Sequence, residues 1–253
     1  MMLTFLGTGT SQGVPMIACP CGVCASTDPH DKRLRTSALV TVGGKNILLD
    51  AGPDFRQQLL REKVTHLEGV LLTHEHKDHM GGLDDVRALN YFMKKSIDVY
   101  GEQRVLKQLK EEYAYAFGAH RYPGVPDMTL HAISDDKFLV QDVEVVPVRA
   151  LHYKLPVYGF RIGKLVYLTD ASFVDEKSVD LMKGCEVLVV NALRQDKHLS
   201  HFTLGEALQL IEQVKPRRAY LTHASHQLGL HKEVSKILPK NVWLAYDGLR
   251  VEM

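Results

Sequence analysis

The chain has 253 residues, of which 45% are hydrophobic and 24% are charged. This balance is that of an ordinary globular protein with enough apolar residues for a full core. The formal net charge of +1 provides no overall field that would attract nucleic acid or an anionic membrane, so composition identifies no partner.

The first residues, MMLTFLGTGTSQG, have no basic flank before their short apolar run, which argues against a secretory signal peptide. No run approaches the roughly 20 apolar residues that a membrane span needs. Three of the four cysteines lie together at Cys19, Cys21 and Cys24, which is not a secreted disulfide framework. We therefore expect a cytoplasmic protein that does not bind membranes.

The first half of the chain predicts a strand, a hairpin and then alternating helices and strands. Residues 2–6 form the first strand, and the loop that follows to about residue 35 is too polar and irregular to be core. Two β-rich runs, 37–43 and 46–52, form a hairpin around Gly43 and Gly44. After the hairpin we expect a helix at 53–63, a buried strand at 69–74, a helix at 82–94, a strand at 97–101 and a helix at 102–117.

The second half repeats this order. We expect strands at 129–133, 137–149, 157–162 and 164–169, then a strand at 186–192, a helix at 203–214, a strand at 218–223, a helix near 231–237 and strands at 243–246 and 249–253. Two similar blocks each contain a strand that ends in Thr-His, as LLTHEH and YLTHASH. The prediction is an α/β fold with one domain over 1–253, in which two mixed sheets pack as a sandwich with helices outside.

The run LLTHEHKDHMGGL contains three histidines and an aspartate that we consider as metal ligands. We expect strand geometry to carry His74 and His76 to one side, and the next loop to turn Asp78 and His79 to the same point. Imidazoles and a carboxylate suit zinc or another first-row divalent ion. The alternative is a polar surface loop, which would seldom place four such residues in six positions directly after a buried strand.

One loop cannot complete the ligands of two metal ions, so the interpretation requires others at further strand ends. His152, Asp170 and His223 each follow an apolar run. Any one of them could be a buried polar group with a hydrogen-bond partner. Their repeated position at strand ends favours the metal site.

These residues together resemble the His-x-His-x-Asp-His signature and later ligands of the metallo-β-lactamase superfamily. The resemblance implies a four-layer αββα sandwich with two metal ions at one edge. It implies that His74, His76 and His152 hold one ion, that Asp78, His79 and His223 hold the other, that Asp170 bridges them, and that Asp50 orients a ligand. The ions would be Zn²⁺ or Mn²⁺, and a hydroxide between them would be the nucleophile.

His201 precedes a predicted helix start at Thr203. It resembles the general-acid histidine of the phosphodiesterase branches of the superfamily, although an ordinary surface histidine would fit the sequence as well. An imidazole can protonate an oxyanion leaving group near neutral pH. We expect His201 and Asp78 to act in catalysis, with His198 as a weaker alternative donor. The final histidine of HKDH and the context of Cys185 disfavour β-lactam hydrolysis.

The cysteine cluster, in the loop at about 7–35, predicts a structural zinc ion. A fourth ligand is needed, and His226 is our choice because a turn after the strand can direct it away from His223. The alternative is three reduced, exposed cysteines. With this cluster, the motifs TFLGTGTSQGVP, LLDAG and LTHASHQ resemble the 5-phosphoribosyl 1,2-cyclic phosphate phosphodiesterases of phosphonate catabolism, in the ribonuclease Z-like branch.

The expected function is hydrolysis of a small cyclic phosphodiester by a dinuclear metal-dependent enzyme. A ribonuclease Z-like nuclease is the main alternative, but its tRNA-binding arm has no room in the 17 residues between His152 and Asp170, so nucleic acid is disfavoured as a partner. Thioester or lactone hydrolysis and a metal-binding protein without turnover are further alternatives. The sequence does not decide whether the protein forms a homodimer.

Overall fold

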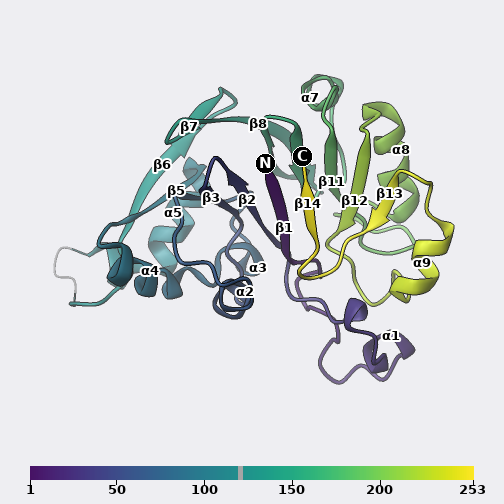
Figure 1. Cartoon of the computed structure of the whole chain (residues 1–253), viewed down its shortest axis with the longest axis horizontal. Coiled ribbons are helices and arrows are strands. Elements are labelled where there is room, and N and C mark those ends of the chain that lie inside the picture. Colours follow the sequence, from purple (N-terminus) through teal and green to yellow (C-terminus); the bar gives the residue numbers. More distant parts are fainter. Residues whose placement is uncertain (119–121) are drawn as a thin grey trace.

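The computed structural model describes residues 1–118 and 122–253. Within these residues, two seven-stranded sheets pack face to face and helices cover both outer faces (Figure 1). The four-layer sandwich predicted from the sequence is therefore confirmed. No helix in this part of the chain combines the length and the apolar character needed to cross a bilayer.

The first sheet has the strand order β14-β1-β2-β3-β4-β5-β6. Strands from β14 to β3 pair antiparallel, and strands from β3 to β6 pair parallel. The strands are β1 (Met2–Gly7), β2 (Ser37–Val42), β3 (Lys45–Leu49), β4 (Gly69–Leu71), β5 (Ile97–Glu102), β6 (Met128–Ile133) and β14 (Arg250–Glu252).

The second sheet has the order β13-β12-β11-β10-β9-β8-β7 and the same division into a parallel and an antiparallel half. This agrees with the two similar blocks in the sequence. The strands are β7 (Phe138–Val140), β8 (Val143–His152), β9 (Leu155–Ile162), β10 (Leu165–Leu168), β11 (Val187–Asn191), β12 (Arg218–Thr222) and β13 (Val242–Leu244).

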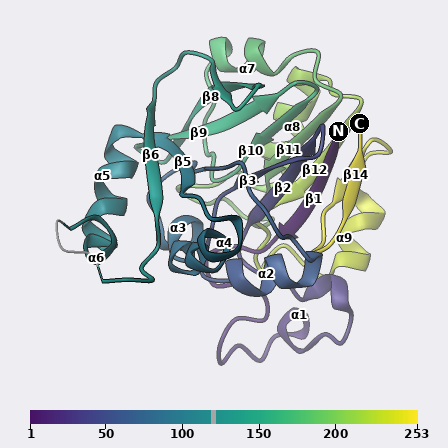
Figure 2. The same cartoon turned by 60° about the vertical axis from the view of Figure 1, so that its left-hand side comes forward.

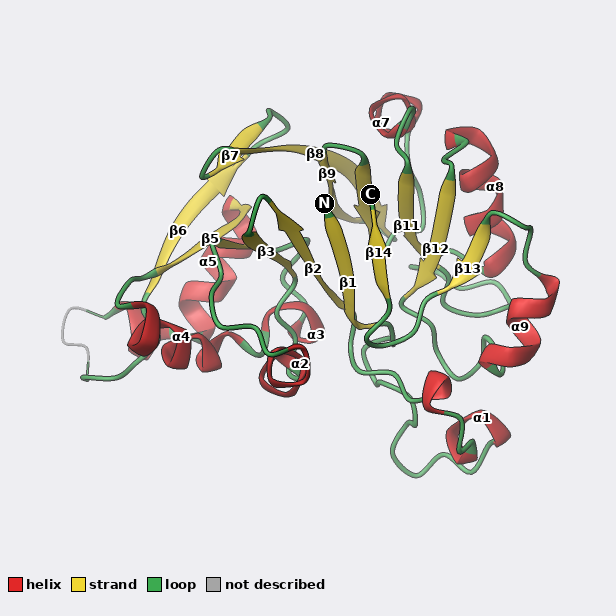
Figure 3. Cartoon of the chain, in the orientation of Figure 1, coloured by secondary structure: helices red, strands yellow, loops and turns green. Residues whose placement is uncertain are grey.

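The helices lie outside the sheets, with α2 to α6 beside the first sheet and α7 to α9 beside the second (Figures 2 and 3). They are α1 (Gly22–Ala25), α2 (Phe55–Glu62), α3 (Lys77–Met80), α4 (Val86–Met93), α5 (Gln103–Glu112), α6 (Ala114–Phe117), α7 (Glu176–Met182), α8 (Leu204–Val214) and α9 (His231–Ile237).

Three buried clusters follow from this layering. Alternate side chains of each strand point to opposite faces, so one set fills the space between the sheets and the other packs under the helices. Phe5, Phe160 and Tyr167 lie between the sheets and are fully buried. The two further clusters join the outer face of each sheet to its helices.

Several predicted boundaries were wrong for local reasons. The helix expected over 102–117 breaks at Tyr113, whose hydroxyl donates to Met80 O at 3.0 Å. The strand expected over 137–149 is two strands, because Gln141 turns the chain with a φ of 55°. The loop at 7–35 is not wholly outside the core, since Val14, Cys24 and Arg33 are buried.

Candidate metal centre

The candidate ligands gather at one edge of the sandwich. Strands β3 and β4 run parallel, as do β10 and β12, and β8 shares the direction of β10 because β9 is antiparallel to both. Their carboxyl ends therefore lie at the same edge, where side chains from distant parts of the sequence can meet. The residues at these ends are Asp50, His74, His152, Asp170 and His223.

One group consists of His74, His76 and His152, whose ligand atoms lie within 4.8 Å of one another. The sequence predicted this grouping but not its local structure. Strand β4 ends at Leu71, so His74 and His76 lie in a loop and not on the strand. The loop aims both rings inward, and His76 is the exposed member of the group.

A second group consists of Asp78, His79, Asp170 and His223, again within 4.8 Å. Asp78 and His79 lie in the single-turn helix α3, which the sequence did not predict. Asp170 also forms a third group with His152 and His201. The three groups share members and are therefore contiguous.

Hydrogen bonds fix the orientation of three of the rings. His79 Nδ1 donates to Asp50 Oδ2 at 2.7 Å, and His152 Nδ1 donates to the carbonyl oxygen of Ser200 at 2.8 Å. Thr73 Oγ1 donates to Asp50 Oδ2 at 2.9 Å and accepts from His74 Nδ1 at 3.0 Å. With these partners the rings of His74 and His152 carry their proton on Nδ1 and present Nε2 as an unprotonated ligand, and the His79 ring would do the same with a cation bound in place of its Nε2 proton.

The inner nitrogen of one of these rings has no protein partner. His74 Nε2 is buried without a hydrogen bond, as is His223 Nδ1, whereas His79 Nε2 lies 3.2 Å from both Asp78 Oδ2 and Asp170 Oδ2. A buried polar atom without a partner costs about 1–3 kcal/mol, and a bound cation would remove this cost for His74 Nε2. The residues therefore fit divalent metal ions, the kind of cofactor that the fold implies.

Burial and charge set the protonation states. Burial lowers the pKa of His223 to about 3 and holds the pKa of His74 well below its usual value, so both rings are neutral. Burial would raise the pKa of Asp170, but His223 and His79 lower it well below the usual range. Burial would lower the pKa of His79, but carboxylates, first that of Asp170, raise it strongly. The pocket thus favours positive charge.

The backbone at the centre is unusual. Asp50, Asp170 and His223 each follow a strand in the left-handed conformation, with φ of 62°, 56° and 55°. Such backbone is uncommon for residues other than glycine and clusters at functional sites. Gly52 lets the chain approach closely, because a Cβ there would lie 2.0 Å from Asp78 O.

His201 lies beside the ligands, at the end of the loop that leads from β11 into α8. Its Nε2 is 3.0 Å from Asp170 Oδ1, and its side chain is 11% exposed. Its Nδ1 lies 3.1 Å from Ser200 Oγ and 3.2 Å from His198 Nδ1. The structure brings His201 to the centre and places His198 behind it.

Cys19, Cys21, Cys24 and His226 form a separate group within 4.8 Å. His226 Nδ1 lies 3.3 Å from the Sγ atoms of both Cys19 and Cys21. Hydrogen bonding, first from the backbone of Cys24, lowers the pKa of the Cys21 thiol to about 6. Three thiols and an imidazole are a donor set that suits tetrahedral zinc.

Some residues that support the site were not predicted from the sequence. A threonine precedes three of the ligands, and the hydroxyls of Thr73 and Thr169 bond Asp50 and Asp170. The repeated pairs Thr-His and Thr-Asp at strand ends could have revealed them. Glu75 lies within the histidine run but turns away and pairs with Arg104.

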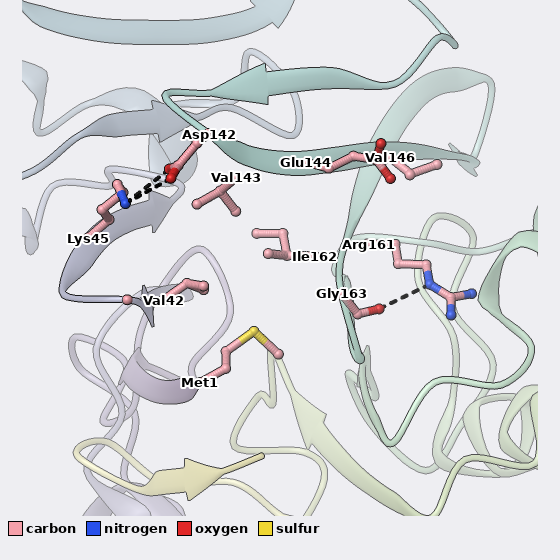
Figure 4. Close-up of a pocket in the computed structure, with 11 residues that line it drawn as sticks. Met1, Val42, Lys45, Asp142, Val143, Glu144, Val146, Arg161, Ile162 and Gly163 are labelled. Atoms are coloured by element: carbon pink, nitrogen blue, oxygen red, sulfur yellow. Dashed lines mark hydrogen bonds and ion pairs between the residues drawn. The ribbon is translucent and has the colours of Figure 1, made fainter.

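A cleft of about 570 Å³ opens at the opposite end of the sandwich (Figure 4). Its lining includes Lys45 at the start of β3 and Val143 at the start of β8, whereas the metal-type ligands follow the carboxyl ends of strands. Lys45 pairs with Asp142 across it at 3.0 Å. No member of the His and Cys groups described above lines it, so the ligands and not the cleft locate the site.

A two-sheet sandwich with these ligands at one edge is the metallo-β-lactamase fold, a class of metal-dependent hydrolases. The family model described as the beta-lactamase superfamily domain matches residues 45–224. A solved structure described as a new diphosphatase from the PhnP family is 37% identical, with a TM-score of 0.93, and the alignment covers 99% of this chain and 96% of that chain. The chain therefore belongs to the beta-lactamase superfamily and, within it, to the PhnP family.

Other relatives carry different names. A Porphyromonas gingivalis protein named octanoyltransferase is 43% identical over 98% of this chain, and a Nostoc punctiforme ribonuclease Z is 26% identical over 73%. The chain spans about half the length of each, 51% and 53%. Zinc-bound PqqB from Methylobacterium extorquens, at 18% identity, a TM-score of 0.81 and full coverage of both chains, shares the fold.

Proposed function

We propose that this protein hydrolyses a phosphodiester bond in a small molecule, with phosphoribosyl 1,2-cyclic phosphate as the first candidate substrate. The observation that carries the proposal is the meeting of two ligand groups through Asp170, with His201 3.0 Å from the same carboxylate. A pair of cations held side by side suits phosphoryl chemistry, because charge builds on several oxygens in the transition state.

The side chains divide between two cations, Zn²⁺ or Mn²⁺. His74, His76 and His152 would hold one, Asp78, His79 and His223 the other, and Asp170 would bridge them. When bound, such a pair supplies Lewis-acid charge and lowers the pKa of water to near 7. Asp50 holds the His79 ring in place through the hydrogen bond to Nδ1.

His201 is the candidate proton donor. Its ring lies at the end of the loop that leads into α8, and its side chain is 11% exposed beside the ligands. A proton on Nε2 would pass to the leaving oxygen, while Ser200 Oγ and His198 hold the other side of the ring. Donation at this point removes the need to expel a strongly basic alkoxide.

A second candidate is hydrolysis of a diphosphate, because the 37% identical member of the PhnP family is described as a diphosphatase. The same cation pair and acid would serve this reaction. The interval between His152 and Asp170 holds only β9, β10 and their turns, so no RNA-binding arm is present there. We rank ribonuclease activity, thioester or lactone hydrolysis and octanoyl transfer as less well supported candidates than either phosphate reaction.

The test uses metal-free protein reloaded with Zn²⁺ or Mn²⁺ and assayed on a ribosyl 1,2-cyclic phosphate, a nucleoside 2′,3′-cyclic phosphate, a diphosphate, a thioester and a precursor tRNA. We expect turnover of the small phosphates only. His201→Ala should reduce kcat on alkyl esters by about 10²–10⁴-fold. It should cost much less on bis-p-nitrophenyl phosphate, whose leaving group needs little protonation.

The matched control is His131→Ala, which removes a half-exposed histidine of the edge strand β6 that pairs with Asp98 of the neighbouring β5. It should leave kcat unchanged. Undiminished turnover of the alkyl esters by His201→Ala, with metal content unchanged, would remove His201 as the donor. Turnover of the thioester alone would contradict the proposed function.

We also propose that Cys19, Cys21, Cys24 and His226 hold a structural zinc ion. The double variant Cys21→Ser, Cys24→Ser should lower the zinc content by about one ion per chain, from about three when all sites hold zinc. Cys185→Ser, at a buried cysteine outside the group, is the control and should not change the zinc content. Equal zinc content in the double variant and the parent protein would contradict this assignment.

A further inference from the structure

His76 is held differently from the two other histidines of its group, His74 and His152, which we call together with it the three-histidine site. His74 Nδ1 donates to Thr73 Oγ1 at 3.0 Å, and His152 Nδ1 donates to the carbonyl oxygen of Ser200 at 2.8 Å. The His76 ring lies beside those of His74 and His152, with centroids 4.5 and 5.1 Å away, but has no hydrogen bond to another residue that the structure describes. The backbone around His76 must therefore hold this ring in place.

That backbone is fixed on both sides. After His76, its carbonyl oxygen accepts from His79 N at 3.0 Å in the turn that begins α3. Before it, Glu75 points away from the metal centre, and its carboxylate accepts from Arg104 Nη1. The side chains of Arg104 and Glu75 are only 31% and 23% exposed, so this pair is better shielded from water than an ordinary surface ion pair. Glu75 is therefore a tether for the residue that follows it.

Arg104 joins this tether to the second sheet. It is the second residue of α5, and its guanidinium has three acceptors. Besides Glu75, they are the carbonyl oxygen of Pro156 on β9, which accepts from Nη2, and Glu102 Oε2, which accepts from Nε at 2.9 Å. A guanidinium presents its donors in a rigid planar fork, so the three acceptors fix one another's positions. One side chain thus holds the histidine loop against the second sheet.

The same contacts reach the strand that ends in His152. Glu102 Oε1 accepts from Arg149 Nη1 at 3.0 Å, and Arg149 lies on β8 three residues before His152. Basic and acidic side chains alternate along this series, so each charge has an opposite neighbour. His76 follows a strand of the first sheet and His152 ends a strand of the second. Arg104 therefore links the two parts of the three-histidine site.

The other ligand group has separate supports. His79 Nδ1 donates to Asp50 Oδ2 at 2.7 Å, and the carbonyl oxygen of His79 accepts from Ala51 N at 2.7 Å. Asp170 accepts from Thr169 Oγ1 at 2.7 Å. These bonds do not involve the guanidinium of α5. A change at that guanidinium should therefore act on one ligand group and leave the other in place.

We propose that Arg104, acting through Glu75, is a positioning residue that sets the affinity of the three-histidine site for its cation. The proposal rests on the proposed function only in taking the three histidines as a metal site. Arg104 acts through other residues, because its donors are directed to Glu75, Glu102 and Pro156. Its loss would let the His76 loop move relative to the second sheet.

The test measures metal binding by metal-free protein and needs no substrate. Zn²⁺ is titrated in competition with a chromogenic chelator, and two sites at the centre and one at the cysteine group are expected. Arg104→Gln and Glu75→Ala should each weaken one site of the centre by about tenfold and leave the others unchanged. Both changes break the same contact, so the double variant should bind little more weakly than Arg104→Gln alone. Arg104→Lys keeps the charge but not the fork and should recover only part of the affinity.

A second pair of backgrounds identifies the site that is affected. His76→Ala removes a ligand of the three-histidine site, so the addition of Arg104→Gln should change the zinc affinities no further. His223→Ala removes a ligand of the other group, and in that background Arg104→Gln should keep its tenfold effect. The reverse pattern would assign Arg104 to the wrong group and overturn the proposal.

The matched control is Arg218→Gln, which removes an arginine that is 27% exposed and pairs with Glu186 at 2.9 Å at the start of β12. It should leave all zinc affinities unchanged. Equal affinities in Arg104→Gln and the parent protein would overturn the proposal, as would a lower Tm of the metal-free variant without a change in affinity, which marks a purely structural contact. If Arg104→Gln does not fold, Glu75→Ala in the exposed loop decides by the same criteria. A parent protein that binds no cation at the centre would instead contradict the proposed function.

Discussion

At the scale of single residues, the centre depends on side chains that hold the ligands as much as on the ligands themselves. The Asp50 carboxylate is fully buried and accepts from His79 Nδ1 and from both the backbone N–H and the hydroxyl of Thr73. Burial raises the pKa of Asp50, while His79 and the hydrogen bonds oppose that rise. One carboxylate therefore holds both Thr73, which precedes His74, and the His79 ring in place.

Replacing this carboxylate by an amide is expected to loosen metal binding. Asp50→Asn leaves one acceptor oxygen where three hydrogen bonds now converge, so the His79 ring loses its fixed orientation. We expect metal affinity to fall by about 10–100-fold, measured by competition with a chromogenic chelator. Asp142→Asn, at the far cleft, is the control and should bind metal normally. An unchanged affinity in Asp50→Asn would show that Asp50 has no orienting role.

At the scale of elements, the loop that carries His201 ends in a well-capped helix. Thr203 Oγ1 accepts from Glu206 N, and the Glu206 carboxylate accepts from Thr203 N, which together form a capping box at the start of α8. The buried face of α8 packs on the second sheet through Leu204, Ala207 and Ile211. The cap thus holds both the helix and the end of the candidate proton-donor loop.

Removing the cap should cost stability. Thr203→Ala leaves the backbone N–H of Glu206 without its acceptor, and we expect the free energy of unfolding to fall by about 1 kcal/mol in urea denaturation. Thr65→Ala, at a loop threonine before β4, is the comparison and should change the free energy by less than about 0.5 kcal/mol. A loss in Thr203→Ala no larger than in Thr65→Ala would mean that the box contributes nothing.

At the scale of the molecule, the candidate centre joins the two sheets. Asp78 and His79 follow a strand of the first sheet, whereas Asp170 and His223 follow strands of the second. Cations bound there would hold the two sheets together at this edge, because they bind the folded arrangement and not the separated ligands. Metal binding and the stability of the whole fold should therefore be coupled.

Metal removal is expected to lower the melting temperature. At a free metal concentration 100 times the Kd, one site contributes about 2.7 kcal/mol. For a chain of this size that corresponds to roughly 5–10 °C in Tm, measured by calorimetry with and without chelator. Asp170→Asn should show a smaller metal-dependent shift than the parent protein. Equal melting temperatures for the metal-free and metal-loaded parent protein would contradict the coupling.

Local patterns explain why much of the fold was predictable. The hairpin at β2 and β3 was confirmed because paired glycines separate two β-rich runs, and Gly43 and Gly44 both have positive φ. Helices α8 and α9 lie where the sequence predicted them, and α8 begins at the predicted Thr203 cap. Strand β4 was located but ends at Leu71 and not at residue 74, and helix α3 was not predicted, because the chain leaves the sheet at Leu71 to aim the histidine loop, which is a tertiary requirement with no local signal.

The sequence by itself determined the ligand types and their place after apolar runs, because residue chemistry and strand periodicity are local properties. Only the tertiary structure decided which of them meet. Cys19 and His226 are 207 residues apart and lie 3.3 Å from each other, while Glu75, between two clustered histidines, turns away to Arg104. The reason is that parallel strands bring their carboxyl ends to one edge whatever their separation in the chain, and the left-handed backbone at Asp50, Asp170 and His223 then turns each side chain into position.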